Sequence, residues 1–225
     1  MGNVSEIQRE INFASLAYLN LWFRTDRHHM LRSTSPVTGT GLRKIAAKYM
    51  VARGISMKDA KGEAVSSQER DRRWSQAADM VSKARGLAEG NAAVVGDLAA
   101  KLGKLDARDY DRTSAATKFL WFAGRHTIRI LDVRAVRALR HLHQPPRGTK
   151  IDYSWFENTW NNQFDRCATE LGRAVLNLPN QFSWSVIPEQ WEKLALTAIR
   201  NPWFRDRVFD QYLWAKGEGA GTAAT

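Results

Sequence analysis

The sequence predicts an all-α fold, a compact domain built from many helices. Segments with apolar residues at helical spacing recur along nearly the whole chain. No segment shows the apolar–polar alternation typical of a half-buried strand. Gly and Pro, 15 and 6 of the 225 residues, are too few for a loop-rich β-protein. We therefore expect one helical domain over residues 1–215, followed by a disordered tail at 216–225.

The first 123 residues predict five helices. The first helix, residues 5–31, places Ile11, Leu19 and Phe23 near one apolar stripe. A Ser-, Thr- and Gly-rich break at 33–41 follows it, because such residues favour turns. The other helices predicted here span residues 42–52, 68–87, 92–102 and 113–123, with a polar hairpin at 104–112 before the last.

Beyond residue 123, the segment 128–131 is too short to be more than an extended connector. Asp132 then begins a helix to His141 that is expected to bury Val133, Val136 and Leu139. Two consecutive prolines within 144–148 end this helix. The later helices are predicted at 153–176, 188–199 and 202–214, the last two beginning at prolines, which are tolerated at first helical positions.

The cysteine count and hydropathy exclude several classes of protein. A single cysteine, Cys167, excludes a disulfide framework and a multi-cysteine zinc or iron–sulfur site. The adjacent His28 and His29 point to different sides of a helix and make a poor metal pair. No apolar run approaches the roughly 18 residues of a membrane span, and the N-terminus does not resemble a signal peptide. We expect a monomeric cytoplasmic protein with no membrane contact, no metal and no cofactor.

The positive charge of the chain is concentrated in one segment. The whole sequence has 34 basic and 23 acidic residues, a net charge of +11. Residues 112–150 hold nine of the basic residues but a single acid, Asp132. A solvated basic face is one interpretation, and a surface that contacts phosphates is the other. Seven arginines around one carboxylate favour the second, with double-stranded DNA as the partner.

Two neighbouring runs within this basic segment resemble a known family. These are Ser114–Ala123 (SAATKFLWFA) and Ile130–Leu139 (ILDVRAVRAL). They resemble the helix-hairpin-helix DNA glycosylases, most closely the branch similar to bacterial 8-oxoguanine DNA glycosylases. The resemblance covers about residues 105–142. It implies that Lys118 is the Schiff-base lysine of lyase-competent members and that Asp132 is the catalytic aspartate.

Asp132 and Lys118 would have different chemical roles in base excision. Cleaving a nucleobase from deoxyribose builds positive charge at C1′ and O4′, which a nearby carboxylate stabilises while it orients or deprotonates water. A lysine among arginines tends towards a lowered pKa, which frees its amine to attack C1′ instead. The alternatives are that Asp132 is only an N-cap and that Lys118 only binds phosphate.

Aromatic and amide side chains in two places predict a pocket for a base rotated out of the duplex. We expect the base to contact Trp121, Trp155, Trp160 and Asn161, although tryptophans at helical spacing are often core and the run 158–163 could be the polar side of a helix. The backbone phosphates are expected to contact Arg112, Arg125, Arg129, Arg134 and Arg137.

The sequence therefore predicts a DNA glycosylase that leaves an abasic site, possessing lyase activity if Lys118 acts as nucleophile. Its substrate could be oxidised guanine or a hypermodified base of phage DNA in antiviral defence. The alternatives are a non-catalytic DNA-binding or adaptor protein on a glycosylase-like fold, and a helical protein–protein module whose charge serves solubility.

Overall fold

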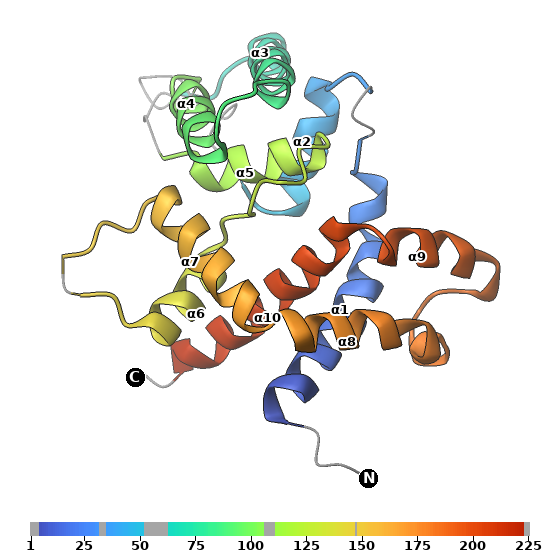
Figure 1. Ribbon diagram of the computed structural model, residues 1–225. Coiled ribbons are helices and arrows are strands. Elements are labelled where there is room, and N and C mark those ends of the chain that lie inside the picture. The colour runs from blue at the N-terminus through green and yellow to red at the C-terminus, as the bar shows by residue number, and fades with distance from the viewer. Residues whose placement is uncertain (1–4, 32–34, 52–62, 106–110, 147, 223–225) are drawn as a thin grey trace. The chain divides into compact units, whose positions relative to one another are not determined.

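A computed structural model describes residues 5–31, 35–51, 63–105, 111–146 and 148–222. These residues form helices joined by turns and loops, and none of them forms a β-sheet (Figure 1). The predicted all-α fold is confirmed. Residues 106–110 of the predicted polar hairpin lie outside the described ranges.

The chain divides into two compact units, where the sequence predicts one domain. We call residues 29–131 the inserted unit, and residues 1–28 with 132–225 the terminal unit. Hydrophobic periodicity could not reveal this division, because it predicts helices but not which of them share a core.

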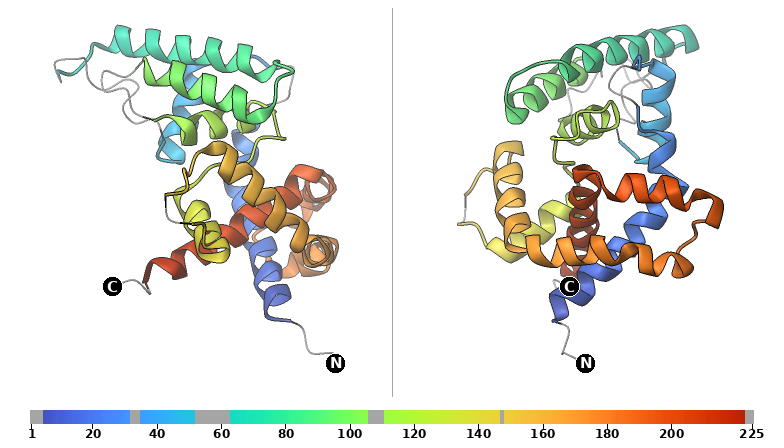
Figure 2. Two further views of the ribbon diagram at one scale, coloured as in Figure 1. Left: turned by 60° about the vertical axis from the view of Figure 1, so that its left-hand side comes forward. Right: turned by 45° about the vertical axis from the view of Figure 1, so that its right-hand side comes forward.

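The inserted unit is built around one fully buried helix. Its helices are α2 (Gly39–Lys48), α3 (Ser67–Arg85), α4 (Asn91–Gly103) and α5 (Thr113–Phe122). Every residue of α5 from 115 to 122 is buried, and α2, α3 and α4 all pack against it (Figure 2). Trp74 of α3, for example, meets the ring of Phe119 with ring centroids 6.3 Å apart. A helix that is buried all round is the centre of its core.

Helix α2 begins inside the segment predicted as a break. The hydroxyl of Thr38 accepts a hydrogen bond from the backbone N–H of Gly41 at 3.1 Å and caps the first turn. Gly39 lies directly against α3, where a Cβ atom would be 2.9 Å from the backbone carbonyl carbon of Trp74. Gly39 is therefore a packing residue, although its Gly- and Thr-rich surroundings resemble a loop.

The terminal unit contains the remaining helices. They are α1 (Glu6–Arg24), η1 (Asp26–His28), α6 (Val133–His143), α7 (Tyr153–Arg166), α8 (Ala168–Asn177), η2 (Leu178–Trp184), η3 (Glu189–Trp191), α9 (Glu192–Ile199) and α10 (Pro202–Thr222). Helix α10 packs against both α1 and α6, and α8 packs against α1 (Figures 1 and 2). The two ends of the chain thus share one core.

A buried charged network explains why α1 ends at Arg24 rather than near residue 31. The side chain of Asp26 is fully buried, accepts a hydrogen bond from the Tyr18 hydroxyl at 3.3 Å and lies 3.6 Å from the Arg207 guanidinium. Arg207 also binds Asp210 at 2.6 Å. A buried carboxylate requires such partners, so the chain leaves the α-helix to place Asp26 there.

Two further boundaries in the terminal unit differ from prediction. The helix predicted at 153–176 is interrupted at Cys167, whose backbone (φ −101°, ψ 5°) forms a turn between α7 and α8. No Gly or Pro marks this turn. The predicted disordered tail is wrong for residues 216–222, because α10 continues to Thr222 and its Lys216 forms an ion pair with Glu10 at 2.6 Å.

Candidate nucleic-acid interface and catalytic carboxylate

Asp132 is the N-cap of α6, and the predicted start of this helix is confirmed. Its backbone is extended (φ −128°, ψ 143°), and Oδ1 accepts a hydrogen bond from the backbone N–H of Arg134 at 3.0 Å. The side chain is half-buried. The cap fixes the direction of the carboxylate while leaving it partly open to solvent.

Helix α6 has one apolar side and one basic side. Ala135, Ala138 and Leu139 are buried, and the helix packs closely on α10. Val133 is 69% exposed, so the prediction that it is buried is wrong. At 100° per residue, Val133 lies on a different side of the helix from Ala135, Ala138 and Leu139.

The basic side of α6 is formed by Arg134, Arg137, Arg140 and His141, and no residue from 133 to 143 is acidic. Arg137, Arg140 and His141 are exposed, and Arg134 is half-buried. Basic side chains at both i,i+3 and i,i+4 spacing follow one side of a helix, which suits contacts to successive phosphates.

The C-terminal turns of α10 contact two of these arginines. The Arg134 guanidinium lies 3.9 Å above the centre of the Trp214 ring and 3.2 Å from Glu218. Arg137 donates a hydrogen bond to the carbonyl oxygen of Gly217 at 3.3 Å. The sequence could not reveal Gly217 and Glu218, because their Gly- and Ala-rich surroundings are typical of a tail.

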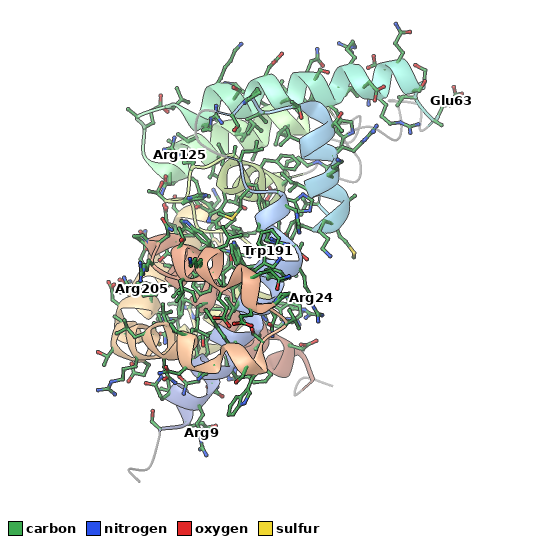
Figure 3. The ribbon with its side chains drawn as sticks, turned by 90° about the vertical axis from the view of Figure 1, so that its right-hand side faces the viewer. Arg9, Arg24, Glu63, Arg125, Trp191 and Arg205 are labelled. Carbon is green, nitrogen blue, oxygen red and sulfur yellow. The ribbon has the colours of Figure 1, made fainter. Side chains whose placement is uncertain are left out.

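Arg125 has a structural role, which corrects its prediction as a phosphate contact. The guanidinium of Arg125, a residue labelled in Figure 3, donates to the carbonyl oxygens of Ala84 at 3.2 Å, Leu87 at 2.7 Å and Glu89 at 2.7 Å, and to Asn91 Oδ1 at 3.4 Å. These acceptors lie in the last turn of α3, in the connection after it and at the first residue of α4, and carbonyls at the end of a helix lack partners within it. The arginine holds the α3–α4 connection, and these four acceptors engage both terminal nitrogens of its guanidinium.

Two other predicted phosphate contacts lie in the inserted unit. Arg112 directly precedes α5, is half-buried, and has its pKa lowered by desolvation. Arg129 is half-buried in the connector 128–131. Their DNA contacts stay predictions.

Lys118 is buried within the inserted unit, with 5% of its surface exposed. Its amine donates to the Ser114 hydroxyl at 3.0 Å and to the carbonyl oxygen of Leu131 at 3.3 Å. Nearby, Thr117 Oγ1 accepts from the backbone N–H of Leu131 at 3.2 Å. These contacts fasten the connector to α5. The prediction that Lys118 is a nucleophile requires a free amine. In the structure, the amine donates hydrogen bonds to both of these oxygens.

Two of the four predicted base contacts are core residues, which corrects their prediction. Trp121 is 1% exposed and packs on Phe122 and His126, with ring centroids 4.9 and 5.0 Å apart. Trp160 is fully buried, stacks on Phe164 and donates its indole N–H to Asp210 at 2.7 Å. Neither ring can stack on a base. The spacing i,i+4 between Trp160 and Phe164 was the available signal for core packing.

The other two predicted base contacts, Trp155 and Asn161, are half-buried on α7. Their roles stay predictions. The backbone N–H of Trp155 donates to the carboxylate of Asp152, the N-cap of α7, at 3.0 Å.

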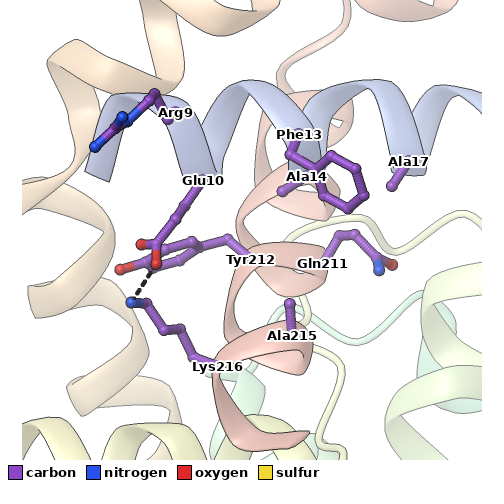
Figure 4. Close-up of a pocket in the computed structure, with 9 residues that line it drawn as sticks. All are labelled: Arg9, Glu10, Phe13, Ala14, Ala17, Gln211, Tyr212, Ala215 and Lys216. Carbon is purple, nitrogen blue, oxygen red and sulfur yellow. Dashed lines mark hydrogen bonds and ion pairs between the residues drawn. The ribbon is translucent and has the colours of Figure 1, made fainter. Parts of the chain in front are cut away.

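A pocket of about 360 Å³ lies between α1 and α10 in the terminal unit (Figure 4). Phe13, Ala14 and Ala215 line its apolar part, and Glu10 and Lys216 form an ion pair at its polar end. Burial raises the pKa of Tyr212, which also lines it, to about 12. None of the predicted site residues lines this pocket.

Searches of the described residues and of known proteins add few constraints. Among the described residues, no three His, Cys, Asp or Glu side chains are grouped so as to hold a metal ion. In the same residues, every helix is too short or too polar to cross a bilayer. No family model, curated protein or solved structure matches this chain. The resemblance to helix-hairpin-helix glycosylases stays a prediction.

Proposed function

We propose that the chain binds duplex DNA through the basic side of α6 and excises a base with the carboxylate of Asp132. The observation that carries the proposal is the composition of this helix. A carboxylate whose direction is fixed by the Arg134 N–H stands at its start, and the exposed Arg137, Arg140 and His141 follow it. Phosphates on the arginines would bring deoxyribose to the start of the helix.

The proposed reaction is hydrolysis of the N-glycosidic bond. The C1′–N bond breaks and the base leaves with the bonding electron pair, while positive charge develops on C1′ and O4′. The Asp132 carboxylate stabilises this charge and accepts a proton from water, whose oxygen bonds to C1′. The base takes up a proton, and an abasic site remains.

The contacts of Lys118 favour a reaction without strand cleavage. Schiff-base chemistry requires a deprotonated amine that reaches C1′. The Lys118 amine donates instead to Ser114 and to the Leu131 carbonyl. We therefore propose a monofunctional glycosylase, and borohydride should trap no adduct between wild-type protein and abasic DNA. Trapping that is lost in Lys118→Met would restore the lysine to the mechanism.

The deciding experiment measures abasic sites after incubation with DNA that carries normal, oxidised or hypermodified bases. Asp132→Asn should abolish base release and leave DNA binding intact, since Asn caps a helix nearly as well as Asp. Asp152→Asn, which changes the N-cap of α7 in the same way, is the matched control and should retain activity. If the wild type releases no base from any of these DNAs, the catalytic proposal is wrong.

A second candidate is a non-catalytic DNA-binding protein. The burial of Trp121 and Trp160 favours it, because it removes two of the four residues expected to hold a base. This candidate predicts salt-dependent duplex binding that is unaffected by Asp132→Asn and weakened by Arg140→Met. Absence of DNA binding even at low salt would instead favour a protein–protein module.

A further inference from the structure

The end of α10 occupies part of the surface that the proposed function assigns to DNA. Residues 214–219, which we call the strap, supply the aromatic face and the carboxylate that hold Arg134. The strap also supplies the Gly217 carbonyl that accepts from Arg137. Each of these partners contacts an arginine guanidinium group that a phosphate would otherwise bind.

The strap lies against α6 because residue 217 has no side chain. A Cβ at Gly217 would lie 2.7 Å from the carbonyl carbon of Arg134 and closer still to its oxygen. These are backbone atoms of the helix and cannot rotate away. The close approach is therefore specific to glycine at this position. Gly219, two residues further, has open space where its Cβ would be.

Although Gly217 is buried, the strap has more exposed residues than the preceding part of α10. Before it, Val208, Phe209 and Leu213 are fully buried, whereas Trp214, Ala215, Glu218 and Gly219 are exposed. Glycine is among the poorest helix formers, and Gly217 and Gly219 lie within the last two turns. The ion pair of Lys216 with Glu10 anchors α10 to α1 just before these glycines. A ligand that binds α6 can therefore displace the part of the strap beyond Lys216, with the Gly217 carbonyl and the Glu218 carboxylate, without unpacking the core.

We propose that the strap is a built-in competitor of DNA on α6. In the absence of DNA it contacts the guanidinium groups of Arg134 and Arg137. Phosphates displace it and take over both guanidinium groups, so binding requires the end of α10 to leave α6. This inference rests on the proposed DNA binding by α6 but not on catalysis by Asp132.

The test compares duplex-DNA affinity for two pairs of matched variants. Gly217→Ala forces the strap from α6, and Gly219→Ala adds the same methyl group where there is room. Glu218→Gln removes the ion pair to Arg134, and Glu189→Gln removes another exposed carboxylate, from η3. Affinity is measured by fluorescence anisotropy on a labelled duplex over a range of salt concentrations.

Gly217→Ala and Glu218→Gln should each bind DNA on the order of 3- to 10-fold more tightly than their controls, because one or two more arginines are open to phosphate. A chain truncated after Lys216 should do the same, which covers the case that Gly217→Ala fails to fold. In the wild type, DNA should speed amide hydrogen exchange in residues 217–222 and slow it in α6.

The outcomes separate the two proposals. If the wild type binds DNA but the strap variants match their controls and DNA leaves exchange in 217–222 unchanged, the strap is only a packing element and this inference is wrong. If neither the wild type nor any strap variant binds DNA, the proposed function fails and the inference fails with it.

Discussion

Replacing Arg125 by methionine should destabilise the protein without weakening its binding to DNA. The sequence places this arginine among the phosphate contacts, whereas the structure gives its guanidinium three backbone carbonyls and one side-chain oxygen at the end of α3. Methionine retains much of the aliphatic stem and removes every donor. The variant therefore tests which of the two roles is correct.

The expected loss of stability follows from these contacts. A hydrogen bond from a charged donor contributes about 1.5–3 kcal/mol when it is measured singly. Two of the carbonyls belong to the exposed residues Leu87 and Glu89 and can bind water once the arginine is gone. We expect a total loss of about 2–4 kcal/mol in the free energy of unfolding, below the simple sum of the bonds.

The assay pairs Arg125→Met with Arg140→Met, which removes an exposed guanidinium from α6. Urea denaturation followed by tryptophan fluorescence reports stability, with Trp74 and Trp121 as the two reporters inside the inserted unit. Anisotropy on duplex DNA reports affinity. Arg125→Met should lower only stability and Arg140→Met only affinity. An Arg125→Met variant that is as stable as the wild type but binds DNA less tightly would refute the structural role.

Three further predictions concern the two cores. Trp160→Phe removes the indole N–H that binds Asp210 and leaves a buried carboxylate oxygen without that donor. The free energy of unfolding, measured by urea denaturation, should fall by about 1–3 kcal/mol. Unchanged stability would contradict the contact. Gly39→Ala should lower the melting temperature because its Cβ would collide with the backbone of Trp74, whereas Gly96→Ala, with open space in α4, should leave it unchanged or raise it. Because the pKa of Tyr212 is raised to about 12 in the folded state, its contribution to stability is present below about pH 10 and is lost as pH rises towards 12. Tyr212→Phe should therefore lose less stability than the wild type across this interval, and equal losses would show that Tyr212 titrates normally.

Helix positions could be predicted from the sequence where caps and apolar spacing agree. The start of α6 at Asp132 is the clearest example, because an N-cap residue directly precedes an amphipathic run. The turn at Cys167 could not be predicted, since no Gly or Pro marks it. The early end of α1 depends on Asp26 meeting Arg207, which is 181 positions away in the sequence. No local pattern contains a contact of that kind.

The sequence predicts only part of the candidate site, because contacts between residues distant in the sequence are again not contained in a local pattern. Residue type and spacing indicate which side chains could bind phosphate or a base, but not which of them the fold already uses. Arg125 and Trp160 have the chemistry expected of a DNA interface, and both are engaged within their own cores. The basic side of α6 could be identified because charge periodicity along a single helix is a local property.

The division of the chain into a terminal unit and an inserted unit has a consequence for its biosynthesis. During translation, α1 emerges before the inserted unit, yet its packing partners α8 and α10 follow more than 140 residues later. The inserted unit, which forms one compact unit from residues 29–131, leaves the ribosome while α1 still lacks those partners. On the ribosome, the inserted unit should therefore fold before the terminal unit. Helix α1 is the segment that a nascent-chain chaperone would have to shield longest.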